Sequence, residues 1–191
     1  DLRGQYQKIQ SKVDDSVIKT INSASFINGP QVKSFQKHLE KYLGVKHVIP
    51  CANGTDALQI ALMALDLIPG DEVITPDFTY ASTIEVILLL GLTPVLVDID
   101  IDTFNIDVSG IKNAITSKTK AIIPVHLFGQ VASMNEILEI AQENDLYIIE
   151  DNAQSLGSNF TFKDGSKKKA GTIGHIGTTS VSYTHLTLPT R

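Results

Sequence analysis

The chain has 191 residues, of which 42% are hydrophobic and 19% charged, and its formal net charge at pH 7 is −5. This length is sufficient for one domain with a sizeable core. The negative charge argues against a nucleic-acid-binding protein, which normally presents a basic face, and no apolar run reaches the ~18 residues of a membrane span. Cys51 is the single cysteine, which excludes an intramolecular disulfide and favours a cytoplasmic location.

The first 45 residues predict two amphipathic helices. Apolar residues recur at helical spacing from about Gln5 to Ile21. A second helix is expected to begin after Pro30 and to end at Gly44, because glycine readily adopts the left-handed conformation that closes a helix. We assign residues 1–45 to an N-terminal helical segment.

From residue 46 onward the pattern changes to alternating strands and helices. We predict strands at 47–51, 72–75, 94–98, 121–125 and 147–150, with helices at 55–65, 79–90, 111–115 and 134–142 between them. Such alternation produces βαβ units, in which helices cover a largely parallel sheet. The predicted fold class is therefore α/β, a three-layer, mostly parallel sheet flanked by helices, over residues 46–180.

Three segments are expected to lie outside this pattern. Lys167–Lys169 lies between two glycines and predicts a surface turn. The segment GTIGHIG at 171–177 is only superficially similar to a nucleotide-binding loop, because its glycine spacing is wrong and no strand–helix unit surrounds it. Residues 181–191 show no continuing helix or strand pattern, and we expect a non-native or disordered tail there.

The segment Asn53-Gly54-Thr55 joins a predicted strand to a predicted helix. The N–H groups of a helix N-terminus attract anions, and the Thr55 hydroxyl adds a further donor. The glycine spacing and the missing lysine exclude a Walker A loop and a dinucleotide fingerprint. The segment predicts either an anion site or merely a helix cap formed by Asn53 or Thr55.

Further candidate residues are expected at the same edge of the sheet. Tyr80 follows a predicted strand, where its ring either stacks on a flat ligand or packs in the core. Asp151 ends a buried strand, with Gln154 in the next turn, and suits a protonated ring nitrogen, metal chemistry or acid–base catalysis. Metal binding is the weakest option, because the histidines are scattered without ligand spacing. Glu150 should face the opposite side of the strand.

An anion site, a stacking ring and a carboxylate for a ring nitrogen together describe pyridoxal 5'-phosphate. The sequence also resembles the DegT/DnrJ/EryC1/StrS sugar aminotransferases, which are fold type I pyridoxal-phosphate enzymes. The resemblance covers about residues 1–180. It is carried by the segments FINGPQV, CANGTDALQIAL, GDEVITPDFTYAST, PVLVDID, AIIPVHLFGQ, IIEDNAQSLG and GTIGHIGTTS.

The resemblance implies an aspartate-aminotransferase-like large domain whose cofactor-binding residues are Gly54, Thr55, Tyr80, Asp151, Gln154 and Ser180. The glycine, the threonine and the serine would hold the cofactor phosphate, and the tyrosine would stack on the pyridine ring. The aspartate would pair with the protonated ring nitrogen, and the glutamine would lie near the phenolic oxygen of the ring.

The sequence departs from the family pattern after Ser180. The family's catalytic lysine, which forms the Schiff base with the cofactor, is expected at the position of His185, in a segment that otherwise matches poorly. The family's C-terminal small domain is also absent. We therefore expect a truncated chain that lacks its catalytic residue and is inactive by itself.

For the full-length protein, the resemblance implies a homodimeric transaminase of polysaccharide or amino-sugar biosynthesis. It would move an amino group from glutamate to a nucleotide-linked keto-sugar, and the motifs are most similar to those of members that act on UDP-linked 2-acetamido-3-keto sugars. Two alternatives stay open. One is a lysine-less sugar 3-dehydratase of the same fold that uses His185, and the other is a non-catalytic binding module.

Overall fold

A computed structural model describes residues 1–181, and the chain divides into two compact units, Asp1–Pro50 and Cys51–Arg191. Residues 182–191 lie outside the described residues. The predicted tail at 181–191 therefore falls almost wholly outside the described part of the chain, as does His185.

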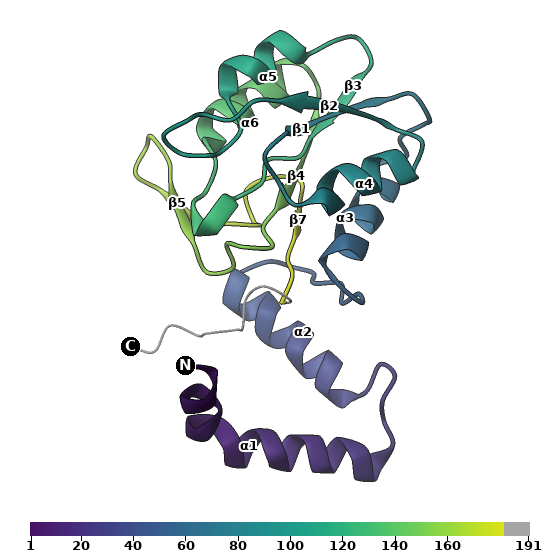
Figure 1. Ribbon diagram of the computed structural model, residues 1–191, viewed down its shortest axis with the longest axis vertical. Coiled ribbons are helices and arrows are strands. Elements are labelled where there is room, and N and C mark those ends of the chain that lie inside the picture. Colours follow the sequence, from purple (N-terminus) through teal and green to yellow (C-terminus); the bar gives the residue numbers. More distant parts are fainter. Residues whose placement is uncertain (182–191) are drawn as a thin grey trace. The chain divides into compact units, whose positions relative to one another are not determined.

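The first unit consists of helices α1 (Leu2–Ser23) and α2 (Pro30–Leu43) (Figure 1). The Asp1 side chain caps α1 by accepting a hydrogen bond from the Gly4 N–H at 3.0 Å. Helix α2 begins with a proline, whose fixed φ suits the first helical position. It ends before Gly44, which adopts the left-handed conformation with a φ of 72°. Both helices and the glycine stop were predicted from the sequence.

The second unit is built on a parallel sheet of five strands in the order β2-β1-β3-β4-β7. These strands are β1 (Glu72–Pro76), β2 (Thr93–Val97), β3 (Thr119–Ile122), β4 (Tyr147–Asp151) and β7 (Ile176–Thr178). A separate antiparallel hairpin is formed by β5 (Asn159–Thr161) and β6 (Lys167–Lys169). Because the five sheet strands are parallel, their carboxyl ends lie at one edge of the sheet.

Helices cover both faces of this sheet (Figure 1). One face carries α3 (Gly54–Met63) and α4 (Ala81–Leu89), and the other carries α5 (Val108–Ala114) and α6 (Met134–Glu143). Successive residues of a strand point to opposite faces, so Ile148 enters the core beneath α5 and α6, whereas Ile149 enters the core beneath α3 and α4. The predicted three-layer α/β fold is confirmed.

The first predicted strand, residues 47–51, is wrong. The segment has no regular structure, and the Val48 N–H donates to Glu40 Oε1 at 3.3 Å instead of to a neighbouring strand. Pro50 has no N–H to offer to a sheet. The fifth strand is instead β7, which the sequence analysis missed because three residues with a central glycine carry no readable period.

The prediction of a surface turn at Lys167–Lys169 is also wrong, because these residues form β6. The turn lies just before them, where the Ser166 N–H donates to Asp164 Oδ1 at 2.8 Å. Within the hairpin, Lys168 Nζ lies 5.8 Å from the centre of the Phe162 ring. The pairing with β5 and this contact explain why a charged run can form a strand.

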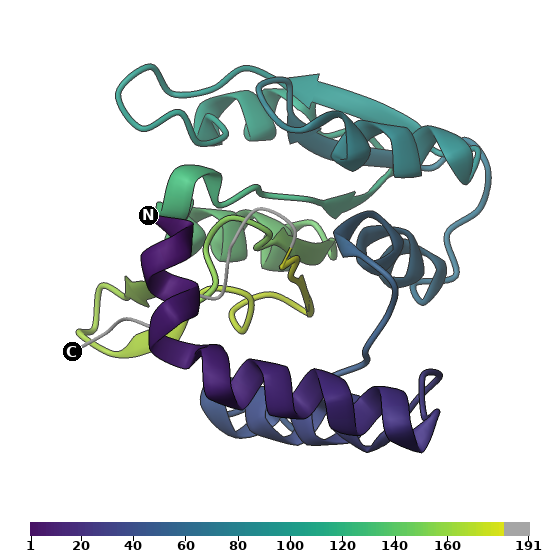
Figure 2. The same ribbon diagram turned by 60° about the horizontal axis from the view of Figure 1, so that its bottom comes forward.

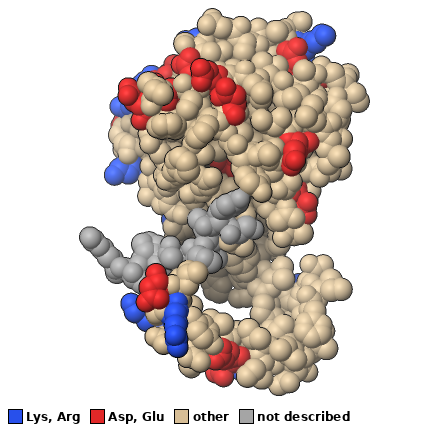
Figure 3. Space-filling model, viewed as in Figure 1, with Lys and Arg blue, Asp and Glu red and all other residues tan. Residues whose placement is uncertain are grey.

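None of the helices among residues 1–181 is both long and apolar enough to cross a membrane. On the face shown in Figure 3, the described Lys and Arg side chains are dispersed among Asp and Glu and form no continuous basic area.

Because helices cover both faces of the sheet, two neighbouring core residues of β4 should contribute about equally to the stability of the fold. Ile148 and Ile149 are both 0% exposed, so replacing either by alanine should lower the free energy of unfolding by about 2–5 kcal/mol. Tyr147→Ala, at a residue that is 42% exposed, is the control and should cost clearly less. Chemical denaturation measures all three; a small effect at Ile148 or Ile149 would mean that one face of the sheet is not covered.

Candidate active site

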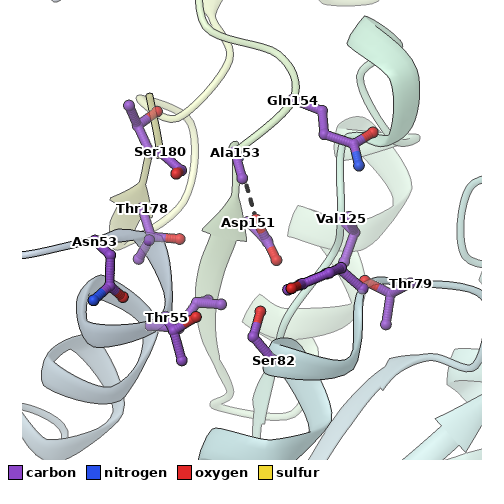
Figure 4. A pocket seen from close by; sticks show the side chains of 14 residues that line it. Asn53, Thr55, Thr79, Ser82, Val125, Asp151, Ala153, Gln154, Thr178 and Ser180 are labelled. Atoms are coloured by element: carbon purple, nitrogen blue, oxygen red, sulfur yellow. Dashed lines mark hydrogen bonds between the residues drawn. The ribbon is translucent and has the colours of Figure 1, made fainter. Parts of the chain in front are cut away.

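A pocket lies at the sheet edge formed by the carboxyl ends of the strands, where parallel α/β sheets bind ligands (Figure 4). Its lining comes from the start of α3, the junction between β1 and α4, and the segments that follow β3, β4 and β7. The lining residues are Asn53, Gly54, Thr55, Leu58, Thr79, Tyr80, Ser82, Val125, Asp151, Ala153, Gln154, Thr178, Thr179 and Ser180. The structure thus brings together all six residues that were predicted to bind a cofactor.

The start of α3 provides one end of the pocket. Asn53 caps the helix, because its Oδ1 accepts a hydrogen bond from the Asp56 N–H at 2.9 Å. The N–H groups of Gly54 and Thr55 belong to the first turn, which has no intrahelical acceptors. A Cβ at Gly54 would lie only 2.7 Å from Ser180 Cβ, so the glycine allows the chain after β7 to approach the helix. The start of α3 is therefore both a helix N-terminus capped by Asn53 and a candidate anion site.

Tyr80 lies at the N-cap position of α4, with an extended backbone (φ −69°, ψ 138°). It lines the pocket and is 56% exposed. This exposure rules out the alternative that Tyr80 is a core residue. An aromatic ring at the mouth of the pocket can stack on a flat ligand.

Asp151 is the last residue of β4, and only 5% of it is exposed. Its Oδ1 accepts a hydrogen bond from the Ala153 N–H at 3.2 Å, and its Oδ2 accepts one from Thr83 Oγ1 at 2.9 Å. Burial raises the pKa of the Asp151 carboxyl above its ordinary value, and these two hydrogen bonds offset the effect only in part. A cation in the pocket would lower this pKa and stabilise the ionised form.

The side chain of Gln154 is held by the short 3-10 turn Leu127–Gly129. Its Oε1 accepts a hydrogen bond from the Phe128 N–H at 2.8 Å. Because the carboxamide oxygen is engaged by a backbone donor, the other end of the group is the Nε2 donor. Gln154 therefore offers a hydrogen-bond donor with a defined orientation at the pocket.

Glu150 precedes Asp151 but points to the other side of β4 and is 0% exposed. Its carboxylate accepts hydrogen bonds from the backbone N–H groups of Gly171 (2.8 Å), Ile173 (2.6 Å) and Gly174 (2.6 Å). The glycine-rich segment 171–177 is thus wrapped around an internal anion. As predicted, Glu150 is not among the residues that line the pocket.

The fourth partner of Glu150 is His126, whose Nε2 lies 2.8 Å from Oε2. The Nδ1 atom of His126 accepts a hydrogen bond from the Ala132 N–H at 3.2 Å, so the proton of the neutral ring is on Nε2. Burial alone would raise the pKa of Glu150, but the hydrogen bonds from His126 and the backbone outweigh it. The pKa of Glu150 lies below its ordinary value.

Several polar residues of this region escaped the sequence analysis. Thr83 is the most important, because it is 0% exposed and binds Asp151 from 68 positions away in the sequence. The sequence did contain one signal for Thr83: it follows Thr79 by four residues in a predicted helix, which places both hydroxyls on the same face. Thr178 and Thr179 were included only within the family segment GTIGHIGTTS and were given no role. Among the described residues, no group of His, Cys, Asp or Glu side chains could hold a metal ion.

Comparison with known proteins gives a consistent set of relatives. The sequence model of the DegT/DnrJ/EryC1/StrS aminotransferase family matches residues 7–187. The UDP-2-acetamido-2-deoxy-3-oxo-D-glucuronate aminotransferase of Pseudomonas aeruginosa is 47% identical over 163 residues, which are 85% of this chain and 45% of that protein.

Solved structures agree with the sequence relatives. A DegT DnrJ EryC1 StrS aminotransferase from Brucella abortus superposes with a TM-score of 0.89 at 43% identity, covering 96% of this chain and 50% of that one. The protein NtdA of Bacillus subtilis, solved with the cofactor PMP bound, superposes with a TM-score of 0.76 at 39% identity, covering 78% and 34%. The chain spans about half the length, or less, of these relatives.

The environments of the two neighbouring carboxylates predict opposite effects of neutralising them. Glu150→Gln should lower the free energy of unfolding by about 3 kcal/mol or more at pH 7, because four donors lose a charged acceptor. The folded-state pKa of Glu150 is lowered, so its stabilisation is present above the unfolded-state pKa of ~4.3. It is lost as the pH falls towards the lower folded-state pKa.

Asp151→Asn in the cofactor-free protein is the matched control, with the reverse sign. The folded-state pKa of Asp151 is raised, so the parent protein should lose stability relative to this variant as the pH rises above the unfolded-state pKa of ~3.9. Chemical denaturation from pH 2 to pH 8 measures both differences, because the contribution of Glu150 changes below its unfolded-state pKa of ~4.3 and that of Asp151 changes above ~3.9. If both variants changed in the same direction with pH, the assigned environments would be wrong.

Proposed function

The chain belongs to the DegT/DnrJ/EryC1/StrS aminotransferase family, and from that premise we propose that its protein is a pyridoxal-phosphate-dependent transaminase. The protein moves an amino group from glutamate to a nucleotide-linked keto-sugar. The observation that carries the proposal is a single pocket that combines a helix N-terminus, an exposed aromatic ring and the buried carboxylate of Asp151.

The residues of the pocket fit pyridoxal phosphate. The buried carboxylate of Asp151 has two hydrogen bonds and no cationic partner among the described residues, and a protonated ring nitrogen would supply that positive charge. A phosphate suits the first turn of α3, where the glycine leaves room and the backbone N–H groups favour an anion. The arrangement supports the cofactor assignment on chemical grounds.

The phosphate end would be held by Gly54, Thr55 and Ser180. The first two contribute N–H groups at the start of α3, and Thr55 and Ser180 add hydroxyl groups. Arg3 is the only arginine among the described residues, so backbone amides and hydroxyls have to take the place of a guanidinium in the pocket. Such donors at a helix N-terminus are sufficient for anion binding.

The ring end would be held by Tyr80, Asp151 and Gln154. When bound, the cofactor supplies an electron sink for the charge that develops on the substrate carbon during amino transfer. Asp151 would keep the ring nitrogen protonated, Gln154 would donate through Nε2 to the cofactor, and Tyr80 would stack on the ring.

Domain boundaries and the proton-transferring lysine are part of the same proposal. Residues 1–45 form the N-terminal helical segment and residues 46–180 the partial cofactor-binding domain. The family's lysine is expected at the position of His185, outside the described residues. The chain spans about half the length of its relatives, and we propose that the full-length protein supplies this lysine together with the small domain that completes the substrate site.

The remaining assignments concern substrate, assembly and location. The Pseudomonas aeruginosa relative is named for a UDP-linked 2-acetamido-3-oxo sugar acid, which supports a UDP-linked 2-acetamido-3-keto sugar as the acceptor. We propose a homodimer, and a cytoplasmic location in which the exposed thiol of Cys51 stays reduced.

Asp151→Asn in the full-length protein should weaken pyridoxal-phosphate binding about a hundredfold, because the ring nitrogen loses its ionic partner in a buried site. Amino transfer from glutamate to the keto-sugar nucleotide should fall at least as much. Cofactor absorbance titration and chromatography of the sugar nucleotide measure the two effects. Asp145→Asn, at an exposed position with a φ of 52° that asparagine also tolerates, is the matched control. A parent protein without cofactor absorbance would contradict the proposal.

Residues 1–191 expressed alone should show no transaminase turnover. The reason is that His185 stands at the position expected for the lysine, and that the chain spans about half the length of the relatives it matches. A coupled assay for glutamate-dependent amination measures this directly, with the full-length protein as the positive control. Turnover by the isolated chain would show that His185 or another residue replaces the lysine.

A further inference from the structure

Three polar side chains form a line from the pocket wall through α4 to Asp151. Thr79 Oγ1 lies 3.1 Å from Thr83 Oγ1, which in turn donates to Asp151 Oδ2 at 2.9 Å. Thr79 lines the pocket, whereas Thr83 is 0% exposed and lies behind it. Helix α4 thus contacts the carboxylate from a side of the site that is closed to solvent.

Two hydrogen bonds determine how the Asp151 carboxylate is turned. The Ala153 N–H engages Oδ1 and Thr83 engages Oδ2, so rotation about the last side-chain bond would break both. An ionised carboxylate has about four acceptor positions, and these two bonds leave acceptor capacity on each oxygen. A ring nitrogen in the pocket can therefore bind without displacing either donor.

On the basis of the proposed function, we propose that Thr83 is a positioning residue for cofactor binding. Its hydroxyl fixes the orientation of the Asp151 carboxylate and stabilises the negative charge that pairs with the ring nitrogen. Ala153 contributes a backbone donor that no side-chain substitution removes. Thr83 is the donor that sequence variation can alter, and it acts through Asp151 without touching the cofactor.

The electrostatic surroundings make this hydrogen bond important. Burial raises the pKa of Asp151, and the donors from Ala153 and Thr83 oppose that shift. The titratable groups on the elements around Asp151 are His126, Glu150, Tyr147, Lys120, Tyr80, Asp56 and Glu85. His126 and Glu150 bind each other on the other side of β4. Tyr147 and Lys120 are exposed near the opposite ends of their strands, Tyr80 lines the pocket, Asp56 accepts a hydrogen bond from Asn53 Nδ2, and Glu85 is exposed.

If Thr83 only stabilised the fold, removing its hydroxyl would have the same effects as removing that of another buried threonine. Thr75 serves for this comparison. Thr75 is also 0% exposed, and its Oγ1 donates to the Ile123 carbonyl at 3.2 Å without contacting Asp151. Removing either hydroxyl should lower stability to a similar extent. Only the loss of the Thr83 hydroxyl should alter the titration of Asp151 and, with it, the affinity for the cofactor.

The experiment compares Thr83→Val, Thr83→Ser and Thr75→Val in the full-length protein. The dissociation constant of pyridoxal phosphate is measured from pH 5 to pH 9, and the protonation of the ring nitrogen is followed by NMR with 15N-labelled cofactor. In Thr83→Val, the pH below which binding weakens should rise by about one unit, with about tenfold weaker binding on that acidic limb. Thr83→Ser should restore the parental profile, and Thr75→Val should retain it.

Each outcome decides between the inference and the proposed function. If the parent binds the cofactor but Thr83→Val has the same pH profile as Thr75→Val, Thr83 is only structural and the inference is overturned. If the parent binds no pyridoxal phosphate, the proposed function fails and the inference fails with it. If Thr83→Val does not fold, Thr83→Ala removes the same hydroxyl without the second methyl group and is subject to the same criterion.

Discussion

Glu150 accepts hydrogen bonds from three backbone N–H groups and one histidine within the protein core, and the loop that supplies the N–H groups leads directly into β7. Strand β7, at the edge of the sheet, pairs with β4 over only three residue pairs. These hydrogen bonds alone hold the position of β7 only weakly. The internal anion fixes the loop before the strand. Ser180 therefore reaches the N-terminus of α3, where Gly54 leaves space for it.

Two consecutive residues of β4 thus place carboxylates in opposite environments. Glu150 has all of its partners within the protein and contributes to the folded state. Asp151 is buried with only two neutral donors, and its ionised form is incomplete until a cation enters the pocket. A cation that bound in the pocket would offset part of the energetic cost of burying this charge. Strand periodicity keeps the two roles separate, because neighbouring side chains point to opposite faces.

The sequence by itself determined the layered α/β architecture and six of the residues that line the pocket. Alternating strands and helices predict a parallel sheet covered on both faces, and apolar neighbours such as Ile148 and Ile149 are explained by burial on opposite faces. Gly54, Thr55, Tyr80, Asp151 and Gln154 could be named because they lie at strand ends, at helix starts or in the turn that follows, whereas Ser180 was added by the family resemblance. Parallel topology brings such junctions to one edge. Gly44 was identified for a comparably local reason, the conformation that ends a helix.

Only the tertiary structure decided which short segments pair and which distant groups meet. Residues 47–51 read as a strand, but the Val48 N–H is bound by a side chain of α2. The glycine-rich segment 171–177 has no periodic pattern, and it becomes ordered around Glu150, more than twenty positions earlier. The hydrogen bond from Thr83 to Asp151 spans 68 positions. Local sequence patterns report which face of an element is buried, whereas hydrogen-bond partners far apart in the chain are set only when the elements pack together.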